Sequence, residues 1–415
     1  MISKWLISGL GIKRWIFLLC AGIFLLGASC GGIYSHIQFT WLNYALLIGA
    51  SLSITAVSLV KIILFVEKMI KIATNGHIDD YFHGVKLKKR LAALPPIVMI
   101  GGGTGLSTML RGIREYSGVS KNLAAIVTVA DDGGSSGRLR EEMNILPPGD
   151  IRNCLIALST DEALLTKLFQ YRFKDCTKLS GHSFGNLFIA AMTEVTGDFL
   201  KAVKESSKIL AVSGKVLPST DVALSLKAVY DDGSVVYGES NIAFNALNKK
   251  ISSVHIEPRD AKALPEALDE ILKAKVIIIG PGSLYTSLMP NLLINDIKEA
   301  VKRSPALKIY ICNVMSQPGE TDNYSAYDHL NVIDTALGGG VIDYIVVSDV
   351  ANASEELLTK YKKARAEPVK IDIERIAHSG VKVIRADLSA ASDFLRHDPD
   401  KLAECVFEII KQKIH

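Results

Sequence analysis

The sequence V-T-V-A-D-D-G-G-S-S-G-R-L-R, residues 127–140, decides the fold. It begins as a β-branched run typical of a buried strand and changes abruptly into two carboxylates, a glycine pair and two hydroxyls. A strand cannot continue through Gly133 and Gly134, so the chain must turn there with backbone amides that have no strand partner. The stretch therefore predicts a strand followed by a loop that can hold a ligand.

This loop has the chemistry of an anion site. Bare amides, small hydroxyls and arginine side chains bind phosphate, and paired carboxylates bind a ribose hydroxyl or a Mg²⁺ ion shared with that phosphate. The candidate binding residues are Asp131, Asp132, Gly133, Gly134, Ser135, Ser136 and Arg138. Asp131 and Asp132 are also the candidate metal ligands. An ordinary polar loop between a strand and a helix is the competing interpretation.

Two further glycine loops follow predicted buried strands, at 96–100 and 275–279. The first leads into a helix, but its spacing matches neither the dinucleotide fingerprint nor a Walker loop. The candidate binding residues of the two loops are Gly101, Gly102, Gly103, Thr104, Gly105, Gly280, Gly282, Ser283, Thr286 and Ser287. Three strand-to-glycine-loop transitions predict a crevice at the carboxyl ends of parallel strands.

Two other polar loops add the candidates Asp150, Arg152, Asn153, His182 and Asn186. Arg152 is the strongest candidate for a diphosphate clamp, because its planar guanidinium binds two phosphate oxygens. A structural salt bridge to Asp150 is the alternative. His182, at a predicted helix start, would hydrogen-bond a phosphate or act as an acid, or it is simply capped or packed. Asn186 has both a donor and an acceptor for a base edge or a sugar hydroxyl.

Six motifs, in order along about residues 96–412, resemble those of the bacterial gluconeogenesis factor family (YvcK type), within the 2-phospho-L-lactate transferase (CofD-like) superfamily. They are GGGTGLS (101–107), TVADDGGSSGR (128–138), PPGDIRN (147–153), GHSFGN (181–186), GPGSLYTS (280–287) and QPGET (317–321). Ser316 stands where such proteins usually carry threonine. The resemblance implies a regulator that binds a UDP-sugar and supports cell shape and cell-wall synthesis during gluconeogenic growth, with cell-wall synthesis proteins as partners.

Two other functions stay open. The superfamily's transferase implies a Mg²⁺-dependent phosphotransferase acting on a nucleotide diphosphate, with Asp131, Asp132 and His182 as the catalytic candidates. The sequence carries no Ser-His-Asp elbow and no HExxH pattern, yet phosphoryl-type transfer depends mainly on positioning and positive charge. The second alternative is a membrane adaptor that binds no ligand. Nucleotide-sugar binding itself requires no cofactor, and Mg²⁺ is the one cofactor that the paired carboxylates suggest.

Alternating strands and helices predict a doubly wound, mostly parallel, Rossmann-like α/β sheet. The predicted buried strands include 123–129, 276–279, 307–311 and 344–347. Between about 213 and 257 the pattern becomes that of an antiparallel β insertion on the sheet edge, with a hairpin turn at 231–234. Asp398 and Pro399 predict the N-cap and first turn of a closing helix through Ile410.

Composition limits the partners. A net charge of +4 with scattered basic residues argues against nucleic acid. Six cysteines without a CxxC pair predict reduced thiols in a cytosolic domain. We expect a homo-oligomer that binds a nucleotide diphosphate sugar.

The N-terminus predicts membrane insertion. Apolar runs at about 15–33 and 39–60 are each long enough to cross a bilayer. Lys and Arg flank the pair at both outer ends and are absent from the short connection, so both ends are expected in the cytoplasm. The predicted domains are a transmembrane hairpin (1–66), an amphipathic and basic linker (67–95) and a CofD-like nucleotide-binding α/β domain (96–415), in a multi-pass protein of the bacterial plasma membrane.

Overall fold

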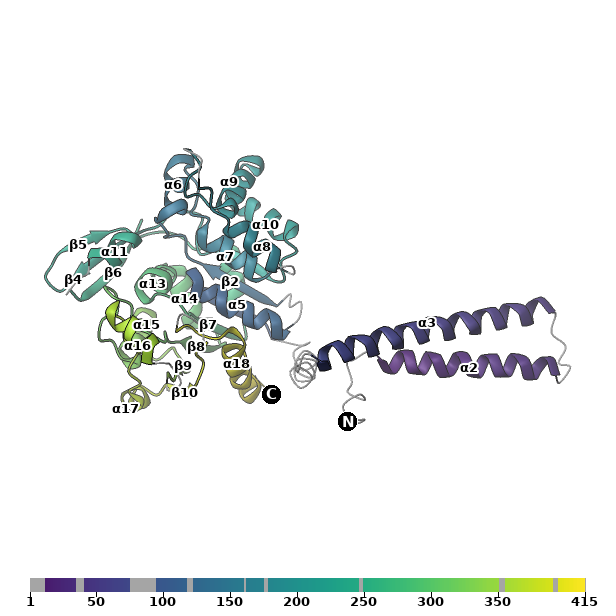
Figure 1. Cartoon of the computed structure of the whole chain (residues 1–415). Coiled ribbons are helices and arrows are strands. Elements are labelled where there is room, and N and C mark those ends of the chain that lie inside the picture. Colours follow the sequence, from purple (N-terminus) through teal and green to yellow (C-terminus); the bar gives the residue numbers. More distant parts are fainter. Residues whose placement is uncertain are drawn as a thin grey trace. The chain divides into compact units, whose positions relative to one another are not determined.

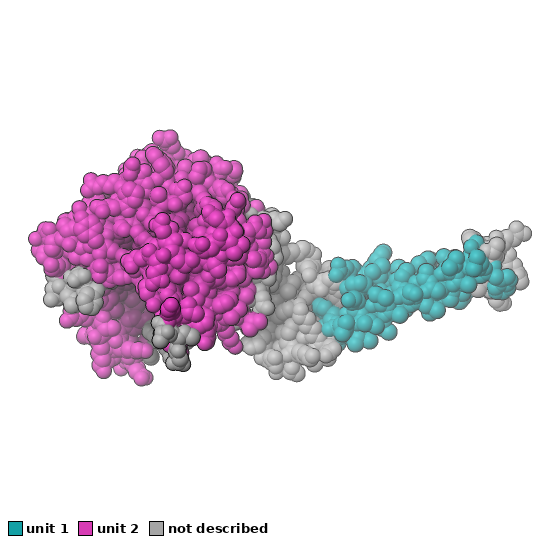
Figure 2. Space-filling view, turned by 90° about the horizontal axis from the view of Figure 1, so that it is seen from above, with its two compact units in different colours: residues 1–93 teal, residues 94–415 magenta. Residues whose placement is uncertain are grey.

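The computed structural model describes residues 12–34, 41–74, 95–117, 122–159, 162–174, 178–245, 249–350, 355–390 and 395–414. The chain forms two compact units, Met1–Ala93 and Leu94–His415 (Figure 2). The finer predicted boundaries at 66 and 95 remain predictions, because most of the linker lies outside the described residues.

The N-terminal unit consists of helices α2 (Ile12–Tyr34) and α3 (Trp41–Thr74). In α3, the segment Trp41–Val66 has 26 residues and a mean hydropathy of 2.1. At about 1.5 Å per residue it exceeds the ~30 Å hydrocarbon layer. The apolar segment of α2, Arg14–Cys30, is shorter. Among the described residues, one helix is thus long and apolar enough to cross a membrane. The predicted connection at 35–38 and the basic cluster at 86–90 lie outside the described residues.

The C-terminal unit is built on a seven-stranded parallel sheet with the strand order β10-β9-β8-β7-β1-β2-β3. Apolar β-branched residues dominate the central strands, and every residue of β1, β2 and β7 is buried. The strands are β1 Ile97–Gly101, β2 Leu123–Val127, β3 Lys215–Pro218, β7 Val276–Ile279, β8 Leu307–Ile311, β9 Tyr344–Ser348 and β10 Lys382–Ala386. The predicted parallel α/β sheet is confirmed.

The strand order reverses between β1 and β7. From β1 the chain adds β2 and β3 on one side, then returns to pair β7 with the other edge of β1 and continues outward to β10. In open α/β sheets, ligands bind outside the carboxyl ends of the strands at such a reversal. The glycine loops after β1 and β7 are therefore neighbours at the expected place.

Helices cover the sheet on both faces. Figure 1 shows α6 to α10 gathered at one end of this unit, while α18 packs along α5. The helices are α5 Gly103–Ser117, α6 Gly134–Met143, α7 Gly149–Ala157, α8 Glu162–Gln170, α9 Phe184–Thr196, α10 Phe199–Ile209, α11 Glu239–Asn245, α12 Pro265–Lys273, the π-helical turn η1 Leu284–Leu288, α13 Met289–Leu292, α14 Asn295–Arg303, α15 Ala326–Leu337, α16 Glu355–Lys363, α17 Ile373–His378 and α18 Pro399–Ile414.

An antiparallel sheet of order β5-β4-β6 projects from this unit (Figure 1). Its strands are β4 Ser225–Tyr230, β5 Val235–Tyr237 and β6 Ile251–Glu257. The hairpin predicted at 231–234 is confirmed, since the amide of Tyr230 donates to the carbonyl of Ser234 at 2.9 Å. The predicted start of the insertion at about 213 was wrong. β3 belongs to the main sheet, because its buried residues pair in parallel with β2.

The closing helix is confirmed and runs four residues beyond Ile410. Asp398 caps it, because its Oδ1 accepts hydrogen bonds from the amides of Asp400 and Lys401, both at 3.0 Å. The cap fixes the entry of α18, which covers α5, the helix that begins at the first glycine loop.

Candidate functional site

A cavity of about 580 Å³ opens at the strand-order reversal. The loops after β1 and β7 form one side of it, and residues after β8, around the end of α16 and before α18 form the other. The sequence-predicted residues that line it are Gly102, Gly103, Thr104, Gly105, Gly282, Ser283 and Ser287. Its size falls in the range of pockets for small organic ligands.

The glycines of the β1 loop permit close backbone contact with the β7 loop. A Cβ added to Gly105 would lie 2.7 Å from the carbonyl carbon of Pro281 and 2.9 Å from Cα of Gly282. α5 begins at Gly103, so the amides of its first turn have no partner within the helix. This helix start and its positive dipole border the cavity, which favours a negatively charged ligand group.

The β7 loop is held from behind by side chains that follow β8. The amide of Gly282 donates to Oδ1 of Asn313 at 3.3 Å, and Nε2 of Gln317 donates to Oγ of Ser283. Ser283 in turn donates to Oε1 of Glu320 at 3.4 Å. These bonds orient the Ser283 hydroxyl in the cavity wall. Asn313 and Gln317 line the cavity as well.

The opposite wall was missed by the sequence analysis. It includes Met315, Tyr361, Leu395 and His397, which come from three separate segments. The hydroxyl of Tyr361 accepts a hydrogen bond from the amide of Leu395 at 2.9 Å, joining α16 to the segment before α18. Apart from the cap motif beside His397, no local sequence signal marks these residues. This wall is largely apolar and suits a flat or hydrophobic ligand part.

His397 is a neutral side chain in this wall. Its ring is buried, and burial lowers its pKa to about 4, although a hydrogen bond with the backbone of Cys312 acts in the opposite direction. Its Nε2 is buried without a partner among the described residues.

Several other predicted polar residues lie outside the cavity lining and form a cluster of hydrogen bonds with one another. Oγ of Ser135 lies 3.1 Å from Nδ1 of His182, and Nδ2 of Asn186 donates to the hydroxyls of Ser135 and Ser136 at 3.1 and 3.3 Å. Burial and then the charge of Arg138 lower the pKa of His182. The hydroxyls at the start of α6 are therefore joined to the start of α9.

Arg152 completes this cluster. Its Nη1 donates to Oγ of Ser183 at 2.7 Å and to Oδ1 of Asn186 at 2.8 Å, while Nη2 donates to Oδ1 of Asn153 at 2.8 Å. Burial is the main cause of the lowered pKa of Arg152. Within the described part of the chain, it has no ion pair with Asp150 inside 4.0 Å. The guanidinium therefore orients α9, and its predicted contact with a diphosphate remains a prediction.

The carboxylates of the β2 loop also have internal partners. Oδ1 of Asp131 accepts from the amide of Gly133 at 2.9 Å, and Oδ1 of Asp132 accepts from the amide of Ser240, at the start of α11, at 2.9 Å. Each retains a second oxygen, as a Mg²⁺ ion bound mainly by ligand phosphates would need. In the described ranges, no group of three His, Cys, Asp or Glu residues is arranged to hold a metal. Magnesium binding remains a prediction.

Asp150 connects the cluster to the cavity. It accepts a hydrogen bond from the amide of Gly103, and a Cβ added to Gly102 would lie 2.7 Å from its Oδ2. Burial and then the charge of Asp131 raise its pKa to about 7. Behind the cavity-lining glycines thus lies a carboxyl group that titrates near neutral pH.

Most other predicted site residues lie outside the cavity lining. Arg138 donates to the carbonyl of Ser180 at 2.9 Å, and Thr286 donates to Oε1 of Glu320 at 3.3 Å. The predicted residues that do not line the cavity are Gly101, Asp131, Asp132, Gly133, Gly134, Ser135, Ser136, Arg138, Asp150, Arg152, Asn153, His182, Asn186, Gly280 and Thr286.

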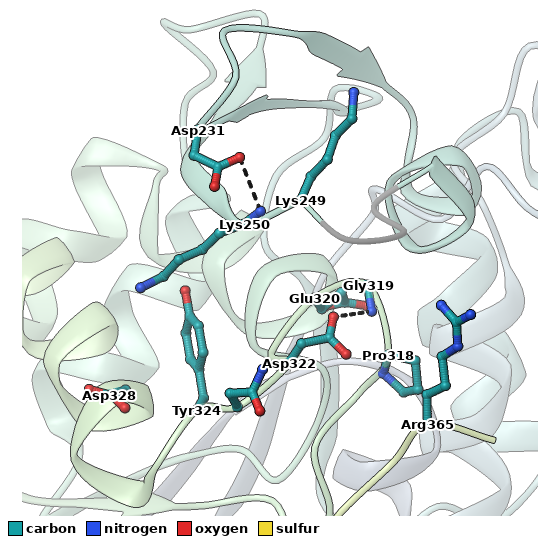
Figure 3. Close-up of a pocket in the computed structure, with 11 residues that line it drawn as sticks. Asp231, Lys249, Lys250, Pro318, Gly319, Glu320, Asp322, Tyr324, Asp328 and Arg365 are labelled. Atoms are coloured by element: carbon teal, nitrogen blue, oxygen red, sulfur yellow. Dashed lines mark hydrogen bonds between the residues drawn. The ribbon is translucent and has the colours of Figure 1, made fainter. Parts of the chain in front are cut away.

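A second cavity, of about 420 Å³, lies between the antiparallel sheet and the loop after β8 (Figure 3). Its lining includes the acidic residues Asp231, Glu320, Asp322 and Asp328 and the basic residues Lys249, Lys250 and Arg365. Lys249 pairs with Asp232 at 2.8 Å, and Oδ2 of Asp322 accepts from the amide of Gly319 at 2.7 Å. The buried Glu320 lines this cavity and, through Ser283, touches the first one. Because acidic side chains outnumber basic ones in its lining, the second cavity is a weaker candidate for a diphosphate.

Comparison with known proteins places these features in context. The family model described as 2-phospho-L-lactate transferase CofD matches residues 97–389. The chain is 43% identical to the putative gluconeogenesis factor of Clostridium acetobutylicum, covering 99% of this chain and 92% of the relative. It is 49% identical to the gluconeogenesis factor of Bacillus subtilis, covering 77% of this chain and 99% of the relative.

A solved structure is similar as well. The crystal structure of a protein from Bacillus halodurans superimposes with a TM-score of 0.72 at 49% identity, over 76% of this chain and 99% of that one. The Clostridium relative matches nearly the whole chain, whereas the two Bacillus proteins match about three quarters of it.

Proposed function

The chain belongs to the gluconeogenesis factor family, with a CofD-like domain, and we propose that it is a membrane-anchored regulator that binds a nucleotide diphosphate sugar, with UDP-sugars as its ligands. The observation that carries the proposal is the cavity at the β1–β7 reversal, bordered by the first-turn amides of α5 and by the β7 loop. Uncharged amides and a helix dipole would bind the diphosphate. The apolar wall with Met315, Tyr361 and Leu395 would accommodate the base or sugar.

The lining of the cavity supports a role in binding rather than in catalysis. Its wall has glycines, hydroxyls and amides together with the side chains of Glu239, Arg396 and His397. The carboxylates of the β2 loop are engaged with backbone amides. Binding without turnover needs no more than this. We propose that the bound nucleotide sugar reports the supply of wall precursors, so that the protein supports cell shape and cell-wall synthesis during growth on gluconeogenic carbon.

Titration calorimetry on the full chain in detergent tests the binding. UDP-glucose is expected to give saturable binding, and CDP-, ADP- and GDP-glucose serve as the comparison ligands. Failure of all four nucleotide sugars to bind would overturn the proposal.

We propose that α2 and α3 together insert as a hairpin with residues 61–415 in the cytoplasm. The length of the apolar part of α3 and the large exposed apolar side chains Phe17, Phe24 and Trp41 support this. In a cysteine-free background, a cysteine at Gln38 should react with an impermeant maleimide in intact cells. A cysteine at Lys88 should react only after lysis, and its labelling in intact cells would refute the orientation.

A Mg²⁺-dependent phosphotransferase is the second candidate, because the family model that matches this chain describes a transferase. Its chemistry would need Asp131 or Asp132 to hold the ion through the oxygen that no backbone amide occupies. Incubation of each nucleotide sugar with Mg²⁺ and the protein separates the two functions. Release of free nucleotide in proportion to enzyme, with water as the acceptor of the phospho-sugar group, would favour the transferase.

A further inference from the structure

One carboxyl group faces the proposed anion site directly. Glu239, the first residue of α11, lines the cavity together with Gly102, Gly103 and Gly105. Its Oε2 is buried and has no hydrogen-bond partner among the described residues. A buried, unpaired carboxylate oxygen is costly, and a negative charge there would repel a phosphate. The position of a carboxyl group with an unsatisfied oxygen beside an anion site therefore requires a physical reason.

The β2 loop holds Glu239 in place. The amide of Ser240 donates to Oδ1 of Asp132 at 2.9 Å, and a Cβ added to Gly133 would lie 2.9 Å from Oγ of Ser240. Gly238 also lies close to the β2 loop, since a Cβ added to it would collide with Oδ2 of Asp132. The start of α11 is thus fixed against the main domain, and the antiparallel insertion delivers a carboxyl group to the cavity.

The surroundings of Glu239 favour its neutral form. Burial is the largest cause that raises its pKa well above the ordinary value, followed by the charges of Asp150, Asp131, Glu320 and Asp132. The protonated carboxyl group is a hydrogen-bond donor, whereas the ionised group can only accept. In its protonated form the side chain can therefore face a phosphate as a donor.

Positive groups near Glu239 do not offset this effect. The ammonium of Lys227, on the neighbouring strand β4, lies 5.4 Å from the ring centroid of Tyr237. Arg396 and His397 line the same cavity, and His397 is neutral at physiological pH because its pKa is about 4. None of these groups is among the causes that shift the pKa of Glu239.

We propose that Glu239 is a ligand-binding residue whose carboxyl group donates a hydrogen bond to a phosphate oxygen of the nucleotide sugar in the β1–β7 cavity. This inference rests on the proposed function. The hydrogen bond satisfies the buried Oε2 and removes the repulsion that an ionised carboxylate would cause. Binding is then linked to a proton, and the ligand is a dianion whose phosphates do not titrate near neutrality.

The test compares three variants of the full chain by titration with UDP-glucose at pH 6.5 and pH 8.5. Glu239→Gln keeps a neutral donor at every pH. It should bind within threefold of the unchanged protein at pH 6.5 and at least tenfold more tightly than it at pH 8.5. Glu239→Ala should lose at least tenfold in affinity at pH 6.5, because both donor and packing are removed.

Asp221→Asn is the matched control, since Asp221 is an exposed carboxylate in the segment between β3 and β4. It should follow the unchanged protein at both pH values. Asp150 and Glu320, whose pKa values are both about 7, remain in every variant, so the charge that they gain with rising pH is present in all of them. Thermal melting confirms that each variant is folded.

Equal affinities for Glu239→Gln and the unchanged protein at both pH values would overturn the proposal while leaving nucleotide-sugar binding intact. Full affinity of Glu239→Ala at pH 6.5 would overturn it as well. Absence of binding by the unchanged protein would instead refute the proposed function, and this inference with it.

Discussion

The glycine loops after β1 and β7 differ from the β2 loop in how they use similar residues. The first two leave amides and hydroxyls at the surface of a cavity. In the third, Asp131 and Asp132 accept bonds from Gly133 and Ser240, and Ser135 and Ser136 bond to the side chains at the start of α9. Glycine, serine and aspartate after a strand therefore build either a binding surface or an internal scaffold.

The partner elements decide between these outcomes. The β1 and β7 loops meet each other at the strand-order reversal, where the helices that follow the two strands diverge and leave space. The β2 loop lies one strand farther on, and the segments that carry Arg152, Asn186 and Ser240 cover it. Strand order, rather than local composition, thus decides that the β1 and β7 loops border an open cavity and that the β2 loop is covered by other segments.

The largest effect is expected from adding one methyl group to the β1 loop. In Gly105→Ala the new Cβ would meet the backbone of Pro281 and Gly282 at 2.7–2.9 Å, and backbone cannot move aside easily. The overpacking should cost roughly 3 kcal/mol of unfolding free energy and abolish UDP-glucose binding.

Gly134→Ala in the β2 loop is its control, because no atom lies within 4 Å of the added Cβ and only the φ of +49° causes strain. Its cost should be about 1 kcal/mol, with affinity unchanged. Urea denaturation and calorimetry check both variants. If Gly134→Ala lost more affinity than Gly105→Ala, the assignment of the open and filled loops would be reversed.

Arg152→Ala tests the filled cluster. It would leave Ser183, Asn186 and Asn153 without their buried charged donor, at a cost of about 3 kcal/mol in unfolding free energy. The affinity for UDP-glucose should fall only if loss of the cluster also disturbs Gly103 in the cavity wall. Arg152→Ala should therefore be measured both by denaturation and by titration with UDP-glucose. A tenfold or greater loss of affinity with unchanged stability would mean that Arg152 contacts the ligand directly.

The sequence predicted the parts of this molecule that depend on local signals. β7 and β8 have the predicted bounds, and Asp398 caps α18 as expected, since apolar runs and cap residues act within a few positions. The cavity wall formed by Tyr361, Leu395 and His397 was not predictable. These residues are brought together only by the order of β8, β9 and β10 and by the last helix.

The roles of the polar residues were harder to predict than their positions. Glycine loops were expected at the ligand, and part of them line the cavity. Whether the carboxylate of Asp132 meets a ligand or the amide of Ser240 depends on an insertion more than 100 residues away along the chain. A single sequence contains no signal for that contact.

The pH dependence of stability tests the residue that connects the two regions. Asp150 joins the bonded cluster around the β2 loop to the β1 loop at the cavity, and Asp150→Asn removes its titration. Its folded pKa of about 7 lies above the ordinary 3.8, so the folded state holds the proton more tightly and stability falls as the pH rises from about 4 to 7. Neighbouring carboxyl groups share part of this effect. Above pH 7, Asp150→Asn should therefore be more stable than the unchanged protein by about 2 kcal/mol.

The advantage of Asp150→Asn should shrink to nothing near pH 4, where both side chains are neutral. Denaturation midpoints across pH 4–8 measure it. An advantage that is constant over this range would show that ionisation of Asp150 is not the cause.

The smallest effect is expected within the open loop, where two hydroxyls share one partner. Ser283 and Thr286 both donate to Oε1 of Glu320, at 3.4 and 3.3 Å, but only Ser283 lines the cavity. Ser283→Ala removes that bond together with a hydroxyl available to the ligand, so affinity should fall about fivefold, or about 1 kcal/mol. Thr286→Val removes the same kind of bond at nearly constant volume and should leave affinity unchanged. Titration of both variants with UDP-glucose separates contact with the ligand from support of Glu320, since equal losses would show that Ser283 acts only through Glu320.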